Sequence, residues 1–414
     1  MTNVSYGRRT YLKAATSGAI ALTGVTGIGT VAASDGADNM LVLIYDDGHL
    51  EDYTEALPLH QEFDAPGCVA ACPGLIGTDE RWLTREQLDE IYDAGWEIMS
   101  HSIEHRALGE IPIESDAIAG DTHIHVQSHR HGQFPGDPLL IFDNTSEVTA
   151  TVEGIATENG ESYLVLEEPL EEDVLVAEDP WVRYTDEFTE WVLEESRDQL
   201  ESWGYPVTAY VHPYNRYDGF VSEVLPEYYD AVPNAGRAPS QIPISNVDPY
   251  HIGRATFETD RMTDEEVTAF IDAIAEDEVF GVLYGHTGYD TLPPERIEHT
   301  LEVAADRDVS VVTLQEALVE LDILQEMPQP PDVQSENAGN DTDSDAHGED
   351  ESTDDTSDPP PDDSDDSDDD TSKQNPEDDS LPGLGAAMAA GSIGGALLYR
   401  RFTHDETESE HILQ

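Results

Sequence analysis

Apolar runs and amphipathic stretches alternate along most of the chain. From Leu41 to Tyr45, five apolar or aromatic residues lead directly into Asp46, Asp47 and Gly48. Such a run predicts a strand buried in a parallel sheet, and because carboxylates cannot lie in the middle of that strand, we expect both aspartates at its carboxyl end. Gly48 would then let the backbone turn sharply. Taken alone, Asp-Asp-Gly is more typical of a turn whose aspartate caps a helix.

The same alternation continues through most of residues 38–326, a length that suits one α/β barrel or two domains. Further strands are predicted over residues 66–74, 96–101, 206–215, 279–288 and 309–318. Helices are predicted over residues 50–63, 84–95, 186–204, 264–277 and 293–308. This order is typical of successive β-α-β units, so we predict a parallel α/β barrel.

Residues 110–184 break this alternation. They contain short alternating runs separated by turn residues, without a helical period, so we predict a small all-β module inserted in the barrel. Its histidines suggest a second metal site, but no acidic residue stands at ligand spacing, and ordinary strand and loop histidines are favoured. These histidines are His123, His125, His129 and His131.

Charge and composition restrict the environment and the binding partners that the chain can have. The chain has 90 acidic and 18 basic residues, a net charge of -72, and its lysines are Lys13 and Lys373 alone. So one-sided a charge is screened within about 3 Å only in molar salt, which indicates a protein of a saturated-brine organism. Nucleic acid is excluded as a partner because no basic face is available.

Both ends of the chain predict export and anchoring. Residues 1–33 combine Arg8 and Arg9, an uncharged apolar run and a Val-Ala-Ala site, typical of a twin-arginine signal peptide. Residues 327–380 are acidic and nearly free of apolar residues, which predicts a disordered stalk. Residues 381–401 are apolar and end in two arginines, so we predict a transmembrane or sorting segment and a cell-surface location.

The two cysteines, Cys68 and Cys72, lie four residues apart. On one strand their Cα atoms would be about 13 Å apart, too far for a disulfide, so we expect small core residues with no metal role.

Other predicted strand ends also carry side chains suited to metal binding or acid-base chemistry. His101 and His105 follow one strand and His286 ends another, while residues 212–214 (His-Pro-Tyr) end a third. In a parallel barrel these ends share one rim, where two histidines and an aspartate can meet around a metal. Surface helix histidines are the alternative for the His101 and His105 spacing alone.

In this order the motifs resemble the polysaccharide deacetylase family, carbohydrate esterase family 4, over roughly residues 40–318. The resemblance implies a distorted (β/α) barrel with a divalent metal, zinc first, with cobalt or another ion as alternatives. It implies Asp47, His101 and His105 as metal ligands, Asp46 as general base and His286 as general acid. The backbone N–H of Tyr214 would help to hold the oxyanion.

Two departures from the family pattern concern the supports of the base and the acid. The arginine of the third motif is replaced by Val211, and the fourth motif, with its Asp and Trp, has no match. Arg254, on an apolar alternating run, is the candidate for keeping Asp46 ionised. A surface arginine paired with one of the many acids is the alternative.

These features predict a metal-dependent hydrolase that removes N-acetyl groups from an extracellular or cell-surface polysaccharide. A catalytically silent glycan-binding protein is one alternative. Hydrolysis of O-acetyl esters or other linear amides on the same fold is another. The oligomeric state is not indicated.

Overall fold

The computed structural model describes residues 39–325, apart from 144, 237 and 278. The predicted signal peptide, acidic stalk and apolar C-terminal segment lie outside these residues. In the described part, no helix has the length and apolar character needed to cross a membrane.

A buried parallel strand lies at the centre of the larger sheet. All eight residues of β1 (Met40–Asp47) are buried, and the strand pairs in parallel with β12 (Val279–Gly285), β2 (Cys68–Ala71) and β13 (Ser310–Val311). The sheet has seven strands in the order β10-β12-β1-β2-β3, with β11 on β12 and β13 on β1. The remaining bounds are β3 (Glu97–Ser100), β10 (Gln241–Pro243) and β11 (Ala255–Thr256).

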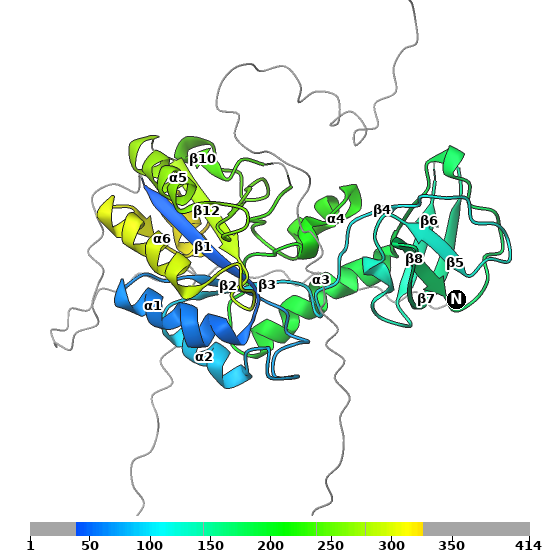
Figure 1. Cartoon of the computed structure of the whole chain (residues 1–414), viewed down its shortest axis with the longest axis horizontal. Coiled ribbons are helices and arrows are strands. Elements are labelled where there is room, and N and C mark those ends of the chain that lie inside the picture. The colour runs from blue at the N-terminus through cyan, green and yellow to red at the C-terminus, as the bar shows by residue number, and fades with distance from the viewer. Residues whose placement is uncertain (1–38, 144, 237, 278, 326–414) are drawn as a thin grey trace, which may run out of the picture. The chain divides into compact units, whose positions relative to one another are not determined.

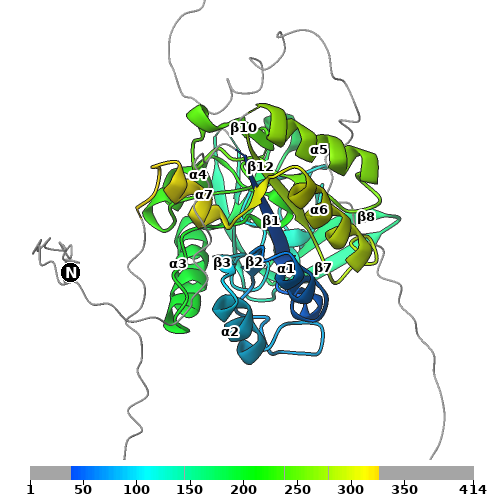
Figure 2. The same ribbon diagram turned by 90° about the vertical axis from the view of Figure 1, so that its left-hand side faces the viewer.

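Helices surround this sheet, as the two views show (Figures 1 and 2). A π-helical turn (Asp52–Ala56) leads into α1 (Leu57–Glu62), and the other helices are α2 (Arg85–Asp93), α3 (Asp186–Ser202), α4 (Gly219–Val224), α5 (Asp264–Asp277), α6 (Pro294–Asp306) and α7 (Leu314–Glu320). Their apolar faces pack inward; α3, for example, buries Val192, Leu193 and Leu200. The fold is therefore mixed α/β, with one predominantly parallel sheet inside a layer of helices.

The predicted barrel does not close as a continuous ladder within the described residues. The main path of the sheet ends at β10, which is antiparallel to β12, and at β3. The strand predicted over residues 206–215 is wrong as a continuous strand. It is reduced to two isolated parallel bridges, Ser100 with Tyr210 and Ala209 with Ala231, and the chain turns at Pro213, which has no N–H to donate to a ladder.

The strand predicted over residues 309–318 is also mostly wrong. β13 covers only Ser310–Val311, and helix α7 begins after Thr313. Thr313 and Glu316 form a reciprocal capping box, in which each side chain accepts a hydrogen bond from the other residue's backbone N–H. This capping box favours a helix here, although the apolar alternation predicted a strand.

Between Ile111 and Tyr184 the chain forms a second sheet of six antiparallel strands, here called the inserted sheet (Figure 1). Its order is β4-β9-β6-β7-β8-β5. The strands are β4 (Ile111–Pro112), β5 (His123–Val126), β6 (Pro138–Phe142), β7 (Glu147–Glu158), β8 (Glu161–Leu166) and β9 (Trp181–Tyr184). The predicted all-β character of this segment agrees with the structure.

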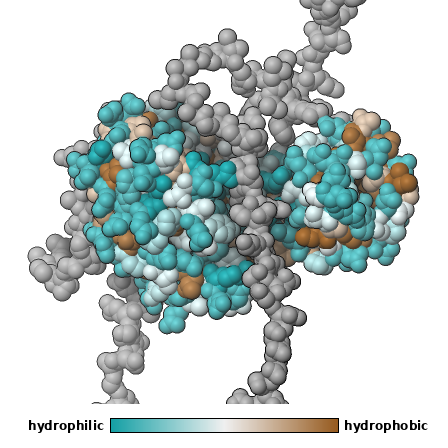
Figure 3. All heavy atoms as spheres, in the orientation of Figure 1, coloured by the Kyte–Doolittle hydropathy of each residue, from teal (hydrophilic) through white to brown (hydrophobic). Residues whose placement is uncertain are grey.

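The face of the described part seen in Figure 3 is mostly hydrophilic, with several apolar patches over the inserted sheet. Exposed apolar side chains in this segment include Ile118, Ile155, Leu175 and Val176. In the core, Cys68 and Cys72 are both buried and free, as expected.

Candidate metal centre and active site

Asp46 and Asp47 are the last two residues of β1. Successive side chains of a regular strand point to opposite faces, so two adjacent carboxylates would normally diverge. Asp47 has a left-handed backbone (φ 79°), followed by Gly48 (φ 80°). The strand thus ends at Asp47. The Asp46 carboxylate faces His286, and the Asp47 carboxylate faces the histidines that follow β3.

Asp47, His101 and His105 form one cluster. The Asp47 Oδ1 atom lies 3.2 Å from His101 Nε2 and 3.1 Å from His105 Nε2. Their ligand atoms all lie within 4.8 Å of one another. The loop after β3 achieves this with left-handed residues, Ser102 (φ 64°) and His105 (φ 61°), so the spacing of four belongs to a tight loop rather than a helix.

The protonation pattern of this cluster fits a divalent metal. His101 Nδ1 donates to the carbonyl oxygen of Val211 at 2.8 Å, which leaves a lone pair on Nε2 facing Asp47. The Asp47 Oδ1 atom is buried and accepts no hydrogen bond. Two imidazoles and a carboxylate are a donor set typical of zinc and of other divalent first-row metals.

The histidines of the inserted sheet make no comparable cluster in the described part of the chain. His125 stacks on Tyr163, and His131 is buried edge-on against Tyr184. They are strand and turn residues, as favoured from the sequence.

Arg254 lies directly against Asp46. Its two terminal nitrogens donate to the two carboxylate oxygens at 2.7 and 2.6 Å, and both side chains are almost fully buried. The guanidinium carbon also lies 3.8 Å from the centre of the Tyr284 ring. Burial alone would raise the pKa of Asp46, but Arg254, His101 and His286 together lower it. Asp46 is thereby kept ionised.

His286, one residue beyond β12, lies between two carboxylates. Its Nε2 is 3.9 Å from Asp46 Oδ2, and its Nδ1 is 2.8 Å from Glu258 Oε1. The backbone N–H of His286 also donates to Glu258. Burial favours the neutral ring, but the hydrogen bond to Glu258 and the charges of Asp47 and Asp46 raise the pKa of His286 to about 10.

Glu258 was missed by the sequence reasoning, which looked for an aspartate and a tryptophan. A signal was present, since Arg254, Thr256 and Glu258 follow the two-residue period of a strand around β11. The partner of Asp46 therefore lies directly before β11, and the partner of His286 lies two residues after it.

Tyr214 lies in the short turn Pro213–Asn215 with a left-handed backbone (φ 57°). Its hydroxyl is 2.9 Å from His105 Nδ1, and the two rings are 4.4 Å apart. With His105 Nε2 directed at Asp47, Nδ1 carries the proton and donates to this hydroxyl. The side chain thus contacts a candidate ligand, a contact that the resemblance did not imply.

His49 is a second neighbour that the sequence reasoning missed. Its Nε2 lies 3.3 Å from Asp47 Oδ2, and its ring stacks on Trp82 at 4.9 Å. A Cβ atom at position 288 would lie 2.5 Å from the Nδ1 atom of His49. The glycine at this position therefore leaves room for the imidazole. The signal was its place directly after Asp-Asp-Gly.

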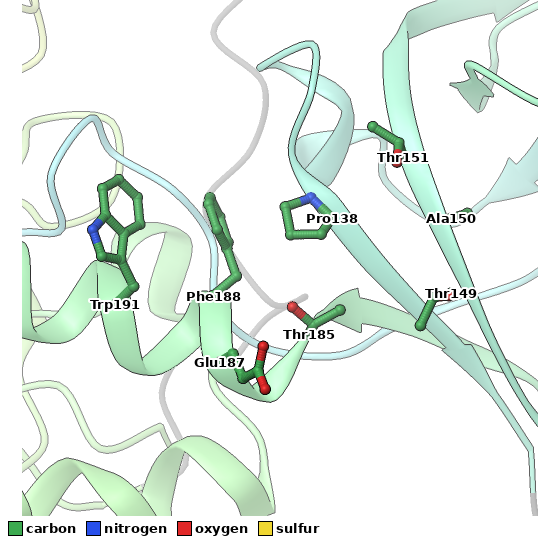
Figure 4. A pocket seen from close by; sticks show the side chains of 8 residues that line it. All are labelled: Pro138, Thr149, Ala150, Thr151, Thr185, Glu187, Phe188 and Trp191. Atoms are coloured by element: carbon green, nitrogen blue, oxygen red, sulfur yellow. The ribbon is translucent and has the colours of Figure 1, made fainter. Parts of the chain in front are cut away.

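A separate hollow of about 540 Å³ lies where α3 meets β6 and β7 (Figure 4). Its lining includes Thr149, Phe188 and Trp191. None of the predicted site residues lines it.

Comparison with known families supports a deacetylase-like domain. The sequence model of the family described as Polysaccharide deacetylase matches residues 33–126, which include the two aspartates of β1 and both histidines of the cluster. The chain therefore contains a polysaccharide deacetylase-like domain whose Asp47, His101 and His105 fit a divalent metal. No curated protein sequence matches the chain significantly.

Several solved structures are similar at low identity. A Streptococcus pyogenes deacetylase in complex with acetate is 14% identical, with 46% of this chain and 53% of that chain covered, at a TM-score of 0.27. A family 4 carbohydrate esterase from Streptomyces lividans is 9% identical, with 66% and 91% covered, at 0.36. The Bacillus subtilis peptidoglycan deacetylase PdaC is 11% identical, with 69% and 92% covered, at 0.38.

This chain thus spans about half of the Streptococcus pyogenes protein.

Proposed function

We propose that this chain is a metal-dependent hydrolase that removes N-acetyl groups from a polysaccharide. The observation that carries the proposal is the pair of Asp46 and His286, which lie 3.9 Å apart beside the Asp47, His101 and His105 cluster. Each of the pair has its own partner of opposite charge, Arg254 for the aspartate and Glu258 for the histidine. A protein that only binds glycans needs neither of these supports.

The residues divide the reaction between them. A bound divalent ion would polarise the acetamide carbonyl and lower the pKa of the attacking water. Arg254 holds Asp46 ionised. Asp46 accepts a proton from that water while the water oxygen bonds to the carbonyl carbon. The family resemblance assigns the oxyanion to the backbone N–H of Tyr214. When the C–N bond breaks, His286 gives its proton to the departing amine, and acetate and a free amino sugar result.

The raised pKa of His286 favours an amide substrate over an ester. An amine leaves readily only if its nitrogen is protonated, whereas an alkoxide leaving group depends less on this proton. The hydrogen bond to Glu258 favours the protonated form of His286 at neutral pH. O-acetyl ester hydrolysis at the same site is the second candidate.

The decisive experiment measures acetate release from a panel of N-acetylated and O-acetylated glycans in high salt. We expect release from N-acetylated glycans that stops after exhaustive chelation and returns with zinc or cobalt. Asp46→Asn and His286→Ala should each abolish it. Release that survives chelation or the Asp46→Asn substitution would exclude the proposed mechanism.

We also infer export by the twin-arginine route and anchoring at the cell surface. Residues 1–33 and 381–401 support this inference. N-terminal sequencing of the mature protein and membrane fractionation would test it, and a mature chain that still begins at residue 1 would contradict it.

A further inference from the structure

A chain of contacts joins the inserted sheet to the candidate metal centre. Arg130 lies between β5 and β6, in the short turn Arg130–Gly132. Its guanidinium carbon is 3.7 Å from the centre of the Tyr214 ring, which is a close cation–π contact. The Tyr214 hydroxyl is 2.9 Å from His105 Nδ1, and His105 Nε2 is 3.1 Å from Asp47 Oδ1.

We propose that Arg130 is a positioning residue for the metal centre, and that the inserted sheet thereby helps to complete that centre. Arg130 fixes the ring of Tyr214, and the Tyr214 hydroxyl fixes the orientation of His105. The proposal rests on the function proposed above only in assuming that the cluster binds a divalent ion.

His105 is the histidine of the cluster that most needs this support. The ring of His101 is anchored by a backbone carbonyl, that of Val211, and its side chain is only 1% exposed. The side chain of His105 is 19% exposed, and its Nδ1 atom is hydrogen-bonded to the side chain of Tyr214. The orientation of His105 therefore depends on where the Tyr214 ring is held.

A second contact fixes the inserted sheet beside the same loop. Arg106, the residue after His105, donates from Nε to Asp137 at 2.8 Å, and both side chains are largely buried. Asp137 immediately precedes β6, so the ion pair joins the inserted sheet to the loop that carries both histidines. The stacking of Arg130 on Tyr214 thus occurs where the sheet is already anchored, and it is not an isolated surface contact.

The test uses the full chain and zinc alone, titrated against a chromophoric chelator. Removing the hydroxyl with Tyr214→Phe should weaken zinc binding about 10- to 100-fold, as is usual when the partner of a metal-binding histidine is lost. Removing the charge with Arg130→Gln should weaken it about twofold to tenfold. Arg130→Lys, which keeps the charge but loses the flat face, should fall between the wild type and Arg130→Gln.

The double variant separates positioning from general stability. If Arg130 acts through Tyr214, adding Arg130→Gln to Tyr214→Phe should change zinc affinity little further. Arg85→Gln is the matched control, since Arg85 also lies over aromatic rings, 5.3 Å from Trp203 and 4.6 Å from Tyr205, and should leave zinc affinity unchanged. Thermal unfolding of the metal-free variants controls for loss of fold.

Wild-type zinc affinity in Arg130→Gln, or an equal loss in both Tyr214 backgrounds, would overturn the proposal. Acetate release is measured separately on the same samples. A protein that shows the expected pattern of zinc affinities but releases no acetate would refute the proposed function and uphold the role of Arg130.

Discussion

At the residue scale, the base and the acid of the proposed reaction are each held by one partner of opposite charge. Arg254 donates two hydrogen bonds to Asp46, and Glu258 accepts hydrogen bonds from the ring and from the backbone N–H of His286. The two partners push the pKa values in opposite directions, down for the aspartate and up for the histidine. Both residues therefore have their working charge at neutral pH.

Replacing Arg254 by Met should slow the reaction at pH 7 by at least about tenfold. Without the guanidinium the pKa of Asp46 rises, so the base protonates more easily and the acidic limb of the pH–rate profile moves to higher pH. The measurement is kcat/KM against pH with metal content checked. Arg254→Lys keeps a positive charge and should move the limb less; an unchanged profile in Arg254→Met would show that Asp46 is held ionised by another group.

Replacing Glu258 by Gln should act on the other limb. The amide oxygen can still accept the His286 hydrogen bond, but the negative charge is lost, so the pKa of His286 falls from about 10. The acid then loses its proton at lower pH, and the alkaline limb of kcat/KM moves to lower pH. Glu90→Gln, an exposed change of the same kind, should leave the profile unmoved, and an unmoved alkaline limb in Glu258→Gln would mean that Glu258 does not tune the acid.

The sequence placed the side chains that follow long strands, because a strand's direction fixes where its end lies. Asp46 and Asp47 end β1, and His286 follows β12; the two strands pair with each other and are mostly buried. Glu258 could not be placed in this way, since β11 has only two residues and its position is set by pairing with β12. The contact of Tyr214 with His105 depends on a left-handed turn that no local sequence pattern predicted.

At the element scale, the predicted helices and the strands next to β1 were found, and the predictions failed where neighbouring structure decides. The helices predicted over residues 84–95, 264–277 and 293–308 correspond to α2, α5 and α6. Residues 206–215 have strand-like residues but form only bridges, because no long neighbour pairs with them in the described part of the chain. The β character of the inserted segment could be predicted from the sequence because apolar alternation and turn residues coincide there.

The inserted sheet should depend for its attachment on the buried pair of Arg106 and Asp137. Asp137→Asn leaves the Arg106 charge buried with only the partly exposed Glu104 beside it. We expect the free energy of unfolding to fall by about 2 kcal/mol, less than for a fully isolated buried charge. Chemical denaturation measures this; Glu153→Gln, on an exposed position of β7, should cost almost nothing, and equal stability of the two variants would contradict the role of the pair.

At the scale of the whole molecule, the dominant property is the net charge of -72. Most acidic side chains of the described part lie on the surface, where their mutual repulsion opposes the compact state. Screening at about 1 M salt shortens this repulsion to about 3 Å. The brine organism predicted from the sequence would account for such a surface.

Salt should therefore stabilise the protein strongly. We expect the midpoint of thermal unfolding to rise steadily as sodium chloride increases from about 0.1 M to beyond 1 M, because screening removes repulsion between exposed carboxylates. Differential scanning calorimetry with matched potassium chloride as a control for ion identity measures the effect. A midpoint that stays constant or falls with salt would argue against adaptation to brine.

The pairing of β4 with β9 has a consequence for how the chain assembles. Ile111 lies opposite Val182, so the inserted sheet begins and ends at the same place. Once this sheet has formed, the segments before and after it are joined at one point. The entropy cost of closing such a loop grows only slowly with its length. The segments on either side, the loop of residues 101–105 and α3, are then joined by a short connection, although residues 106–185 separate them in the sequence.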